Sequence, residues 1–207
     1  MFIEAFSAVL LLVFVVFLYW FLLRRSTGRI LDQYELLAER LGLDLTAPDS
    51  LLFGFVRPEP FLHGRYRDRE ISISAPGKGL QNTRQTETVL KLSVDDGGLR
   101  LQITGSGLLS GMSQRDSGEK KRWLSGDPDF DSAMDLRTND GVRLAMVLAP
   151  EVQKALQKLL SGSGASIYLG NGVFAFTCPG LVANEASRER FEAAAEVLCN
   201  FGELLED

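Results

Sequence analysis

Residues 165–177, ASIYLGNGVFAFT, indicate most clearly how this chain folds. Two runs rich in β-branched and aromatic residues flank Gly170-Asn171-Gly172. Glycine and asparagine adopt the positive φ angles that a tight hairpin turn requires. We therefore expect antiparallel strands over residues 165–169 and 173–177.

Two more hairpins are predicted earlier in the chain, because apolar and polar residues alternate on both sides of a turn. The first turn is Arg67-Asp68, and the second is formed by residues 95–98, where Asp and Gly tolerate positive φ. The strands are expected over residues 62–66, 70–75, 87–94 and 99–103. Strands joined by such short turns indicate antiparallel pairing.

The rest of the chain is mostly helical in its spacing of apolar residues. Helices are expected over residues 30–41, from 141 to 148 behind a cap at Asn139-Asp140, from Pro150 onward, and from 186 to the end. Residues 119–124 and 130–137 are interpreted as additional strands. Strands combined with segregated helices predict an α+β fold.

Residues 5–23 contain no charged side chain and are almost entirely apolar. As a helix they would span about 28 Å, close to the ~30 Å hydrocarbon core of a bilayer. The acidic Glu4 before this segment and the lack of a small-residue cleavage site after it favour a retained signal anchor. Arg24, Arg25 and Arg29 follow the segment, which places the N-terminus outside and the following domain in the cytoplasm.

The predicted architecture is a transmembrane helix followed by one soluble α+β domain of antiparallel sheet with helices packed on it. Its parts are an anchor over residues 1–25, a juxtamembrane amphipathic helix and connector over 26–50, and the domain over 51–207. The net charge of −5 argues against nucleic acid as a partner. Cys178 and Cys199 are expected to be buried, reduced thiols, and with one histidine they are too few for a usual zinc site.

A cationic cluster in the glycine-rich segment 105–128 is the first candidate binding site. It consists of Lys120, Lys121, Arg122 and Trp123, in a segment longer than most loops of compact domains. Together with three arginines of the first hairpin, it could contact anionic lipid headgroups or another anionic ligand. The alternative is that these cations pair with the acids around them.

Three aspartates at alternate positions are the second candidate site. In an extended strand, Asp127, Asp129 and Asp131 would share a face and could hold a metal ion through oxygen atoms. The match to a calcium loop fails further on, where Ser132 and Thr138 replace the required Gly and Glu. The alternative is a turn in which the aspartates bond to the backbone.

No residue pattern indicates a catalytic centre. The G-x-S-x-G motif is absent, and His63 has no nucleophile that the sequence places beside it. The glycines of 105–111 lack the third glycine of a dinucleotide fingerprint, because Ser110 stands in its place. We therefore expect no catalytic residues and no cofactor, and a non-enzymatic function is favoured.

Two short motifs resemble a known pattern: Gly64-Arg65-Tyr66-Arg67-Asp68-Arg69 and Gly126-Asp127-Pro128-Asp129-Phe130-Asp131. They are similar to the G-x-Y-x-x-R hairpin and the G-D-x-x-F-D turn of uncharacterised bacterial single-pass membrane-anchored proteins. The resemblance covers roughly residues 51–177. It implies a bacterial inner-membrane location, and it lends no activity.

Together these observations predict a membrane-anchored cytoplasmic interaction or scaffolding module. Its expected partners are the lipid bilayer, through residues 5–23, and a protein. Two alternatives stay open: a sensor that binds an anionic small molecule or lipid headgroup through the cationic cluster, and a metal-assisted hydrolase that uses the three aspartates.

Overall fold

The computed structural model describes residues 2–48, 59–76, 87–106 and 120–206, except for the side chains of residues 2–9 and 22–27. The helices are α1 (Phe2–Leu41), α3 (Pro128–Ala133), α4 (Gly141–Val147), α5 (Pro150–Leu160) and α6 (Glu185–Glu206). The strands are β1 (Asp44–Thr46), β2 (Phe61–Tyr66), β3 (Arg69–Ser74), β4 (Glu87–Ser93), β5 (Leu101–Gly105), β6 (Lys121–Arg122), β7 (Met134–Thr138), β8 (Ser166–Gly170) and β9 (Val173–Pro179).

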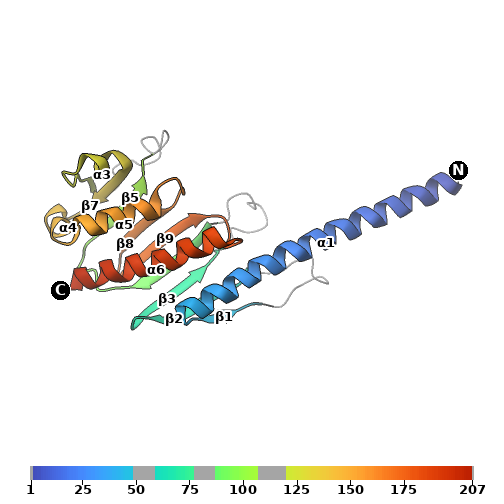
Figure 1. The fold of residues 1–207 in the computed structure, drawn as a ribbon, viewed down its shortest axis with the longest axis horizontal. Helices are drawn as coiled ribbons and strands as arrows, with labels where there is room; N and C mark the ends of the chain where they lie inside the picture. The colour runs from blue at the N-terminus through green and yellow to red at the C-terminus, as the bar shows by residue number, and fades with distance from the viewer. Residues whose placement is uncertain (1, 49–58, 77–86, 107–119, 207) are drawn as a thin grey trace.

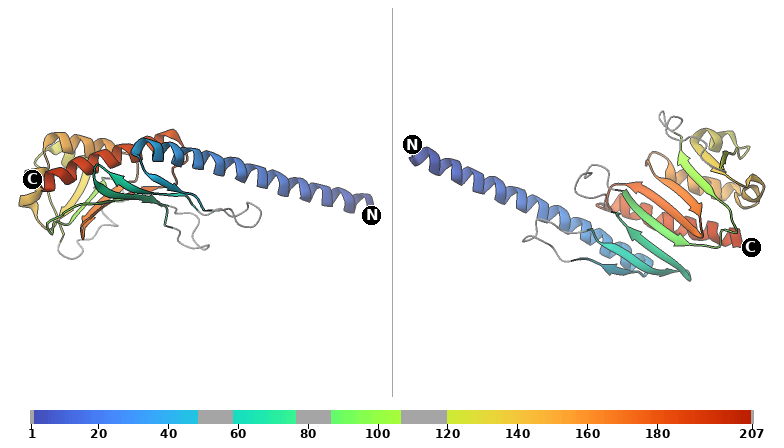
Figure 2. Two further views of the ribbon diagram at one scale, coloured as in Figure 1. Left: turned by 90° about the horizontal axis from the view of Figure 1, so that it is seen from below. Right: turned by 180° about the vertical axis from the view of Figure 1, so that it is seen from behind.

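These strands form one nine-stranded antiparallel sheet in an α+β fold (Figure 1). The strand order is β1-β2-β3-β4-β9-β8-β5-β7-β6. Within the described residues, α6, α5 and the C-terminal part of α1 lie on the same side of the sheet (Figure 2). The fold therefore has a helical layer on one sheet face and an opposite face that we call the open face.

The core lies between the sheet and the helices. One row of apolar side chains crosses seven neighbouring strands, and none of its members is more than 2% exposed. The row consists of Leu62, Ile73, Leu90, Phe176, Ile167, Ile103 and Leu136. From α6, Phe191 packs edge-on against Phe176 with ring centroids 5.3 Å apart. Burial of this row fixes the register, because a shift by one residue would turn it toward the open face.

Two of the predicted hairpins are confirmed. β2 and β3 pair across a turn in which Arg67 and Asp68 have φ of 47° and 62°. β8 and β9 pair across Asn171 and Gly172, with φ of 56° and 75°. Two consecutive positive φ angles belong to the turn type whose twist matches that of a hairpin.

The hairpin predicted around residues 95–98 is wrong. β4 lies between β3 and β9, whereas β5 lies between β8 and β7. The turn itself exists, and the Asp96 carboxylate accepts hydrogen bonds from Gly98 N at 2.8 Å and Gly172 N at 2.7 Å. It leads the chain to another part of the sheet instead of back along β4.

The strand predicted over residues 130–137 is only partly correct. Its first residues belong to α3, and only Met134–Thr138 form a strand, β7. Asp127 accepts the backbone hydrogen bonds of an N-cap, and Pro128 stands at the first helical position. These start signals favour a helix over the alternation of aspartates.

The predicted transmembrane anchor is contradicted. None of the helices in the described part of the chain combines the length and the apolar character that a membrane crossing needs. The anchor and the juxtamembrane helix expected over 30–41 are instead one continuous element, α1, because no residue interrupts the helix after Arg25. The inner-membrane location and the orientation that were inferred from an anchor are corrected with it.

α1 has two different halves. Its C-terminal part packs on the domain, where Tyr34 and Leu37 are fully buried. Its N-terminal part extends away from the sheet (Figure 1). The predicted connector after it contains β1, which pairs with β2, and residues 49–58 lie outside the described residues.

The end of α6 is held to the sheet by Glu206. Its carboxylate accepts hydrogen bonds from both terminal nitrogens of Arg69, at 2.6 and 2.7 Å, and from Asp95 N at 3.0 Å. These bonds, with those from Arg69 first, lower the pKa of Glu206 from 4.5 to about 2.

We expect this contact to make stability depend on pH in the acid range. Because the folded-state pKa lies below the unfolded one, the carboxylate stabilises the fold above about pH 4.5, and this contribution disappears as the pH falls toward 2. The side chain is 35% exposed, so solvent screening limits the effect to about 1 kcal/mol. Urea unfolding of the wild type and Glu206→Gln should differ at neutral pH and converge near pH 2. A difference that stays constant down to pH 2 would contradict this.

Candidate functional site

The structure divides the predicted cationic cluster between two sides of the sheet edge. Lys121 and Arg122 form the short edge strand β6, and both side chains are exposed. The Nζ atom of Lys120 lies 3.4 Å from the Gln102 amide oxygen. Residues 107–119 of the glycine-rich segment lie outside the described residues.

Trp123 has a packing contact of its own. Its indole lies against Gly141 at the first turn of α4, so closely that a Cβ atom at this glycine would collide with it. Since side chains alternate along a strand, Trp123 and Lys121 point to one side and Arg122 to the other. The four residues do not converge on one hollow, and a shared binding site for them stays a prediction.

The three aspartates bond to the local backbone. Asp127 caps α3, and the Asp131 carboxylate accepts hydrogen bonds from Ser125 N and Oγ, both at 2.8 Å, and from Gly126 N at 3.1 Å. Burial alone would raise the pKa of Asp131, but these hydrogen bonds outweigh it and lower the pKa. Asp129 is exposed on the first turn of the helix.

This geometry agrees with the turn alternative for the aspartates. Across the residues that the structure describes, no group of three or more His, Cys, Asp or Glu side chains is arranged to hold a metal ion. The metal-assisted hydrolase therefore stays a prediction that this part of the molecule does not support.

The two cysteines are buried, whereas His63 is exposed on the open face. Cys178 and Cys199 are free and buried, as expected, and burial raises the pKa of the Cys199 thiol. His63 is exposed on the open face, with its ring 5.4 Å from that of Phe61. A thiol that burial keeps protonated is a poor nucleophile.

The open face carries a row of mostly polar side chains that crosses the whole sheet. The strand register places one residue of each strand in this row. Its members are Asp44, His63, Ser72, Lys91, Ala175, Tyr168, Gln102, Arg137 and Arg122. Directly opposite side chains in a sheet lie about 4.5–5.5 Å apart at Cβ, so neighbours in the row can act on one ligand.

A hollow of about 470 Å³ lies at one end of the open face. It extends over β2, β3 and β4, and Val173 of β9 contributes to its border. Side chains that line it include His63, Arg65, Glu70, Ser72, Lys91 and Ser93. We call it the β2–β4 hollow.

Two cations, Arg65 and Lys91, line the β2–β4 hollow. Within the described residues, no carboxylate forms an ion pair with Arg65 or Lys91. Arg69, Arg137 and Arg188, by contrast, are each paired with an acid. Arg65 is oriented by a hydrogen bond from Nη2 to the Asp68 carbonyl oxygen, at 2.7 Å.

The sequence contained part of this site. The Arg67-Asp68 turn places Arg65 opposite Glu70 and His63 opposite Ser72, which follows from hairpin geometry alone. Lys91 could not be placed beside them, because residues 75–86 separate β3 from β4, and a connection of this length does not set the register.

Comparisons with known proteins inform only the fold. No protein family and no curated protein matches this sequence. The crystal structure of the mycobacterial trehalose monomycolate transport factor A, TtfA, is similar with a TM-score of 0.53 at 13% sequence identity. The likeness covers 86% of this chain and 94% of that one. At this identity the two chains share a fold.

Proposed function

We propose that this protein is an interaction module whose partner binds the projecting half of α1, residues 10–21. The observation that carries this proposal is the exposure of this segment. Eleven large apolar side chains in it, from Leu10 to Phe21, are between 45% and 67% exposed. Contiguous apolar surface of this kind is typical of interaction sites.

The contrast within α1 supports the proposal. The packed part of the same helix buries Tyr34 and Leu37 and leaves Leu36 as an isolated exposed apolar side chain. The projecting half has apolar residues at successive positions, so it is apolar on all sides. A helix of this kind is stable when other elements surround it.

The partner that fits this segment is a protein with a deep apolar groove or a group of apolar helices. Covering the remaining exposed area would contribute roughly 1 kcal/mol per side chain before the costs of association. The fold likeness to a transport factor for trehalose monomycolate suggests an accessory role in lipid transport.

Acidic substitutions in the projecting half test the proposal. We expect Leu11→Glu, Val15→Glu and Leu18→Glu together to reduce recovery of the partner more than tenfold, because buried unpaired carboxylates are costly. The measurement is crosslinking in cells that express the full chain, followed by purification and quantitative mass spectrometry. Leu36→Glu is the matched control, since it adds an acid at an exposed apolar site of the same helix.

A protein recovered in stoichiometric amount with the wild type and the control, and lost with the triple variant, supports the proposal. Equal recovery with the triple variant would contradict it. The proposal would also be overturned if the purified wild type brings no other protein with it but floats with phosphatidylcholine vesicles. That result would assign the segment to lipid.

A further inference from the structure

The β2–β4 hollow combines groups that recognise two kinds of chemistry. Arg65 and Lys91 carry positive charge, and neither forms an ion pair with a carboxylate of the described residues. A guanidinium has five N–H donors, so the bond from Arg65 to the Asp68 carbonyl leaves donors for a ligand. An ammonium and a guanidinium that line one hollow suit a phosphate.

The rest of the lining suits hydroxyl groups. Ser72 lies between His63 and Lys91 in the polar row, so its hydroxyl is next to both. Glu70 stands opposite Arg65, and its carboxylate can accept hydrogen bonds but cannot donate them at neutral pH. Glu70 would repel an anion that has no hydroxyl groups. An anion that also carries hydroxyl groups would bind the two cations through its charge and Glu70 through its hydroxyl groups.

We propose that the β2–β4 hollow binds a hydroxyl-bearing phosphate of the glycerol phosphate type. Arg65 and Lys91 bind the phosphate, and Glu70 and Ser72 bind the hydroxyl groups. This chemistry is shared by free glycerol 3-phosphate and by the headgroup of phosphatidylglycerol. The hollow belongs to the sheet and not to α1, so the inference does not depend on the partner of the projecting half.

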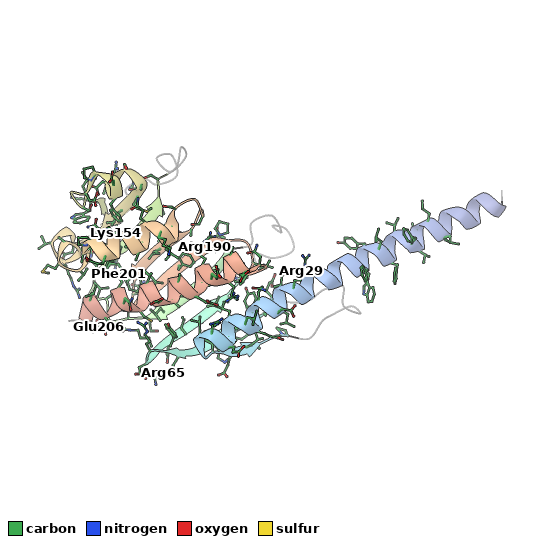
Figure 3. All side chains as sticks on the ribbon, viewed as in Figure 1. Arg29, Arg65, Lys154, Arg190, Phe201 and Glu206 are labelled. Carbon is green, nitrogen blue, oxygen red and sulfur yellow. The ribbon has the colours of Figure 1, made fainter. Side chains whose placement is uncertain are left out.

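The position of the hollow favours exchange with solvent. Arg65 is at the end of the β2–β3 hairpin, and Lys154 lies on α5 in the helical layer (Figure 3). His63, Glu70 and Lys91 are all exposed, so replacing them should not disturb the core. We therefore expect variants at these positions to fold.

Binding to the full chain tests the inference. Isothermal titration with glycerol 3-phosphate should show saturable binding, and Arg65→Gln with Lys91→Gln should weaken it by at least about tenfold, because charged hydrogen bonds are lost. Lys154→Gln is the matched control and should leave the affinity unchanged. Glu70→Gln should reduce the preference for glycerol 3-phosphate over inorganic phosphate.

Vesicle flotation distinguishes the two sources of the ligand. Phosphatidylcholine vesicles with and without phosphatidylglycerol are compared, so any contact of α1 with lipid is common to both. A gain with phosphatidylglycerol that the double variant loses assigns the lipid headgroup, and titration without such a gain assigns the free phosphate. No binding in either assay, or equal binding by the double variant, would overturn the inference and leave the proposal for α1 intact.

Discussion

Phe176→Ala should lower the free energy of unfolding by about 3–5 kcal/mol. Phe176 is fully buried in the central strand β9, between Leu90 on one side and Ile167 on the other. Its ring also packs edge-on against Phe191 of α6. The substitution would leave a cavity between the sheet and its helical layer, where surrounding groups can relax only partly.

Equilibrium unfolding in urea, followed by circular dichroism, measures this loss. Tyr168→Ala is the matched control, since Tyr168 lies on the adjacent strand but points to the open face and is 38% exposed. We expect the control to cost less than about 1 kcal/mol. Equal losses for the two variants would contradict the assignment of the two sheet faces.

Arg143→Ala should destabilise the fold by about 2–3 kcal/mol. The Nη1 atom of Arg143 donates hydrogen bonds to the Asp96 and Gly97 carbonyl oxygens, both at 2.8 Å. Its Nη2 atom donates to the Leu205 carbonyl at 3.1 Å. One side chain of α4 thus joins the turn after β4 to the end of α6.

The same urea titration checks this expectation, with Arg143→Lys as the comparison. Lysine keeps the positive charge but not the planar group that reaches several carbonyls at once, so we expect it to recover only part of the stability. A lysine variant as stable as the wild type would show that charge alone matters. An alanine variant without loss would show that these hydrogen bonds contribute nothing.

Hairpins with short turns could be predicted from the sequence because their pairing is local. Asn171 and Gly172 fix the turn, and the turn fixes which residues of β8 and β9 face each other. The same reasoning failed after Ser93, where a good turn leads into β5, a strand with other neighbours. Pairing between distant segments depends on which apolar faces fit together, and a local motif does not contain that information.

α1 shows a second limit of sequence reasoning. The apolar run was separated from the amphipathic residues after it because their composition differs, although no residue there ends a helix. Gly28 lies within α1 and would meet no neighbouring atom within 4 Å if it carried a Cβ. The change of composition along this segment therefore separates the exposed part of α1 from its packed part, and it does not mark the end of a helix.

The β2–β4 hollow was only half visible in the sequence for the same reason as the strand order. Arg65 and Glu70 belong to one hairpin, but Lys91 joins them through the pairing of β3 with β4. The cationic cluster at 120–123 was conspicuous because its members are consecutive. Neighbours along a strand point to opposite faces, so a consecutive cluster is a weak indication of a shared site.

The pairing of β4 with β9 has a consequence for synthesis of the protein. The central strands of the sheet come from distant parts of the chain, and α1 contacts α6 at the opposite end of the sequence. During translation, the edge of β4 that pairs with β9 stays unpaired until β9 has been synthesised. Folding should therefore be slow and largely post-translational, and chaperones that hold exposed strands should improve the yield of recombinant protein.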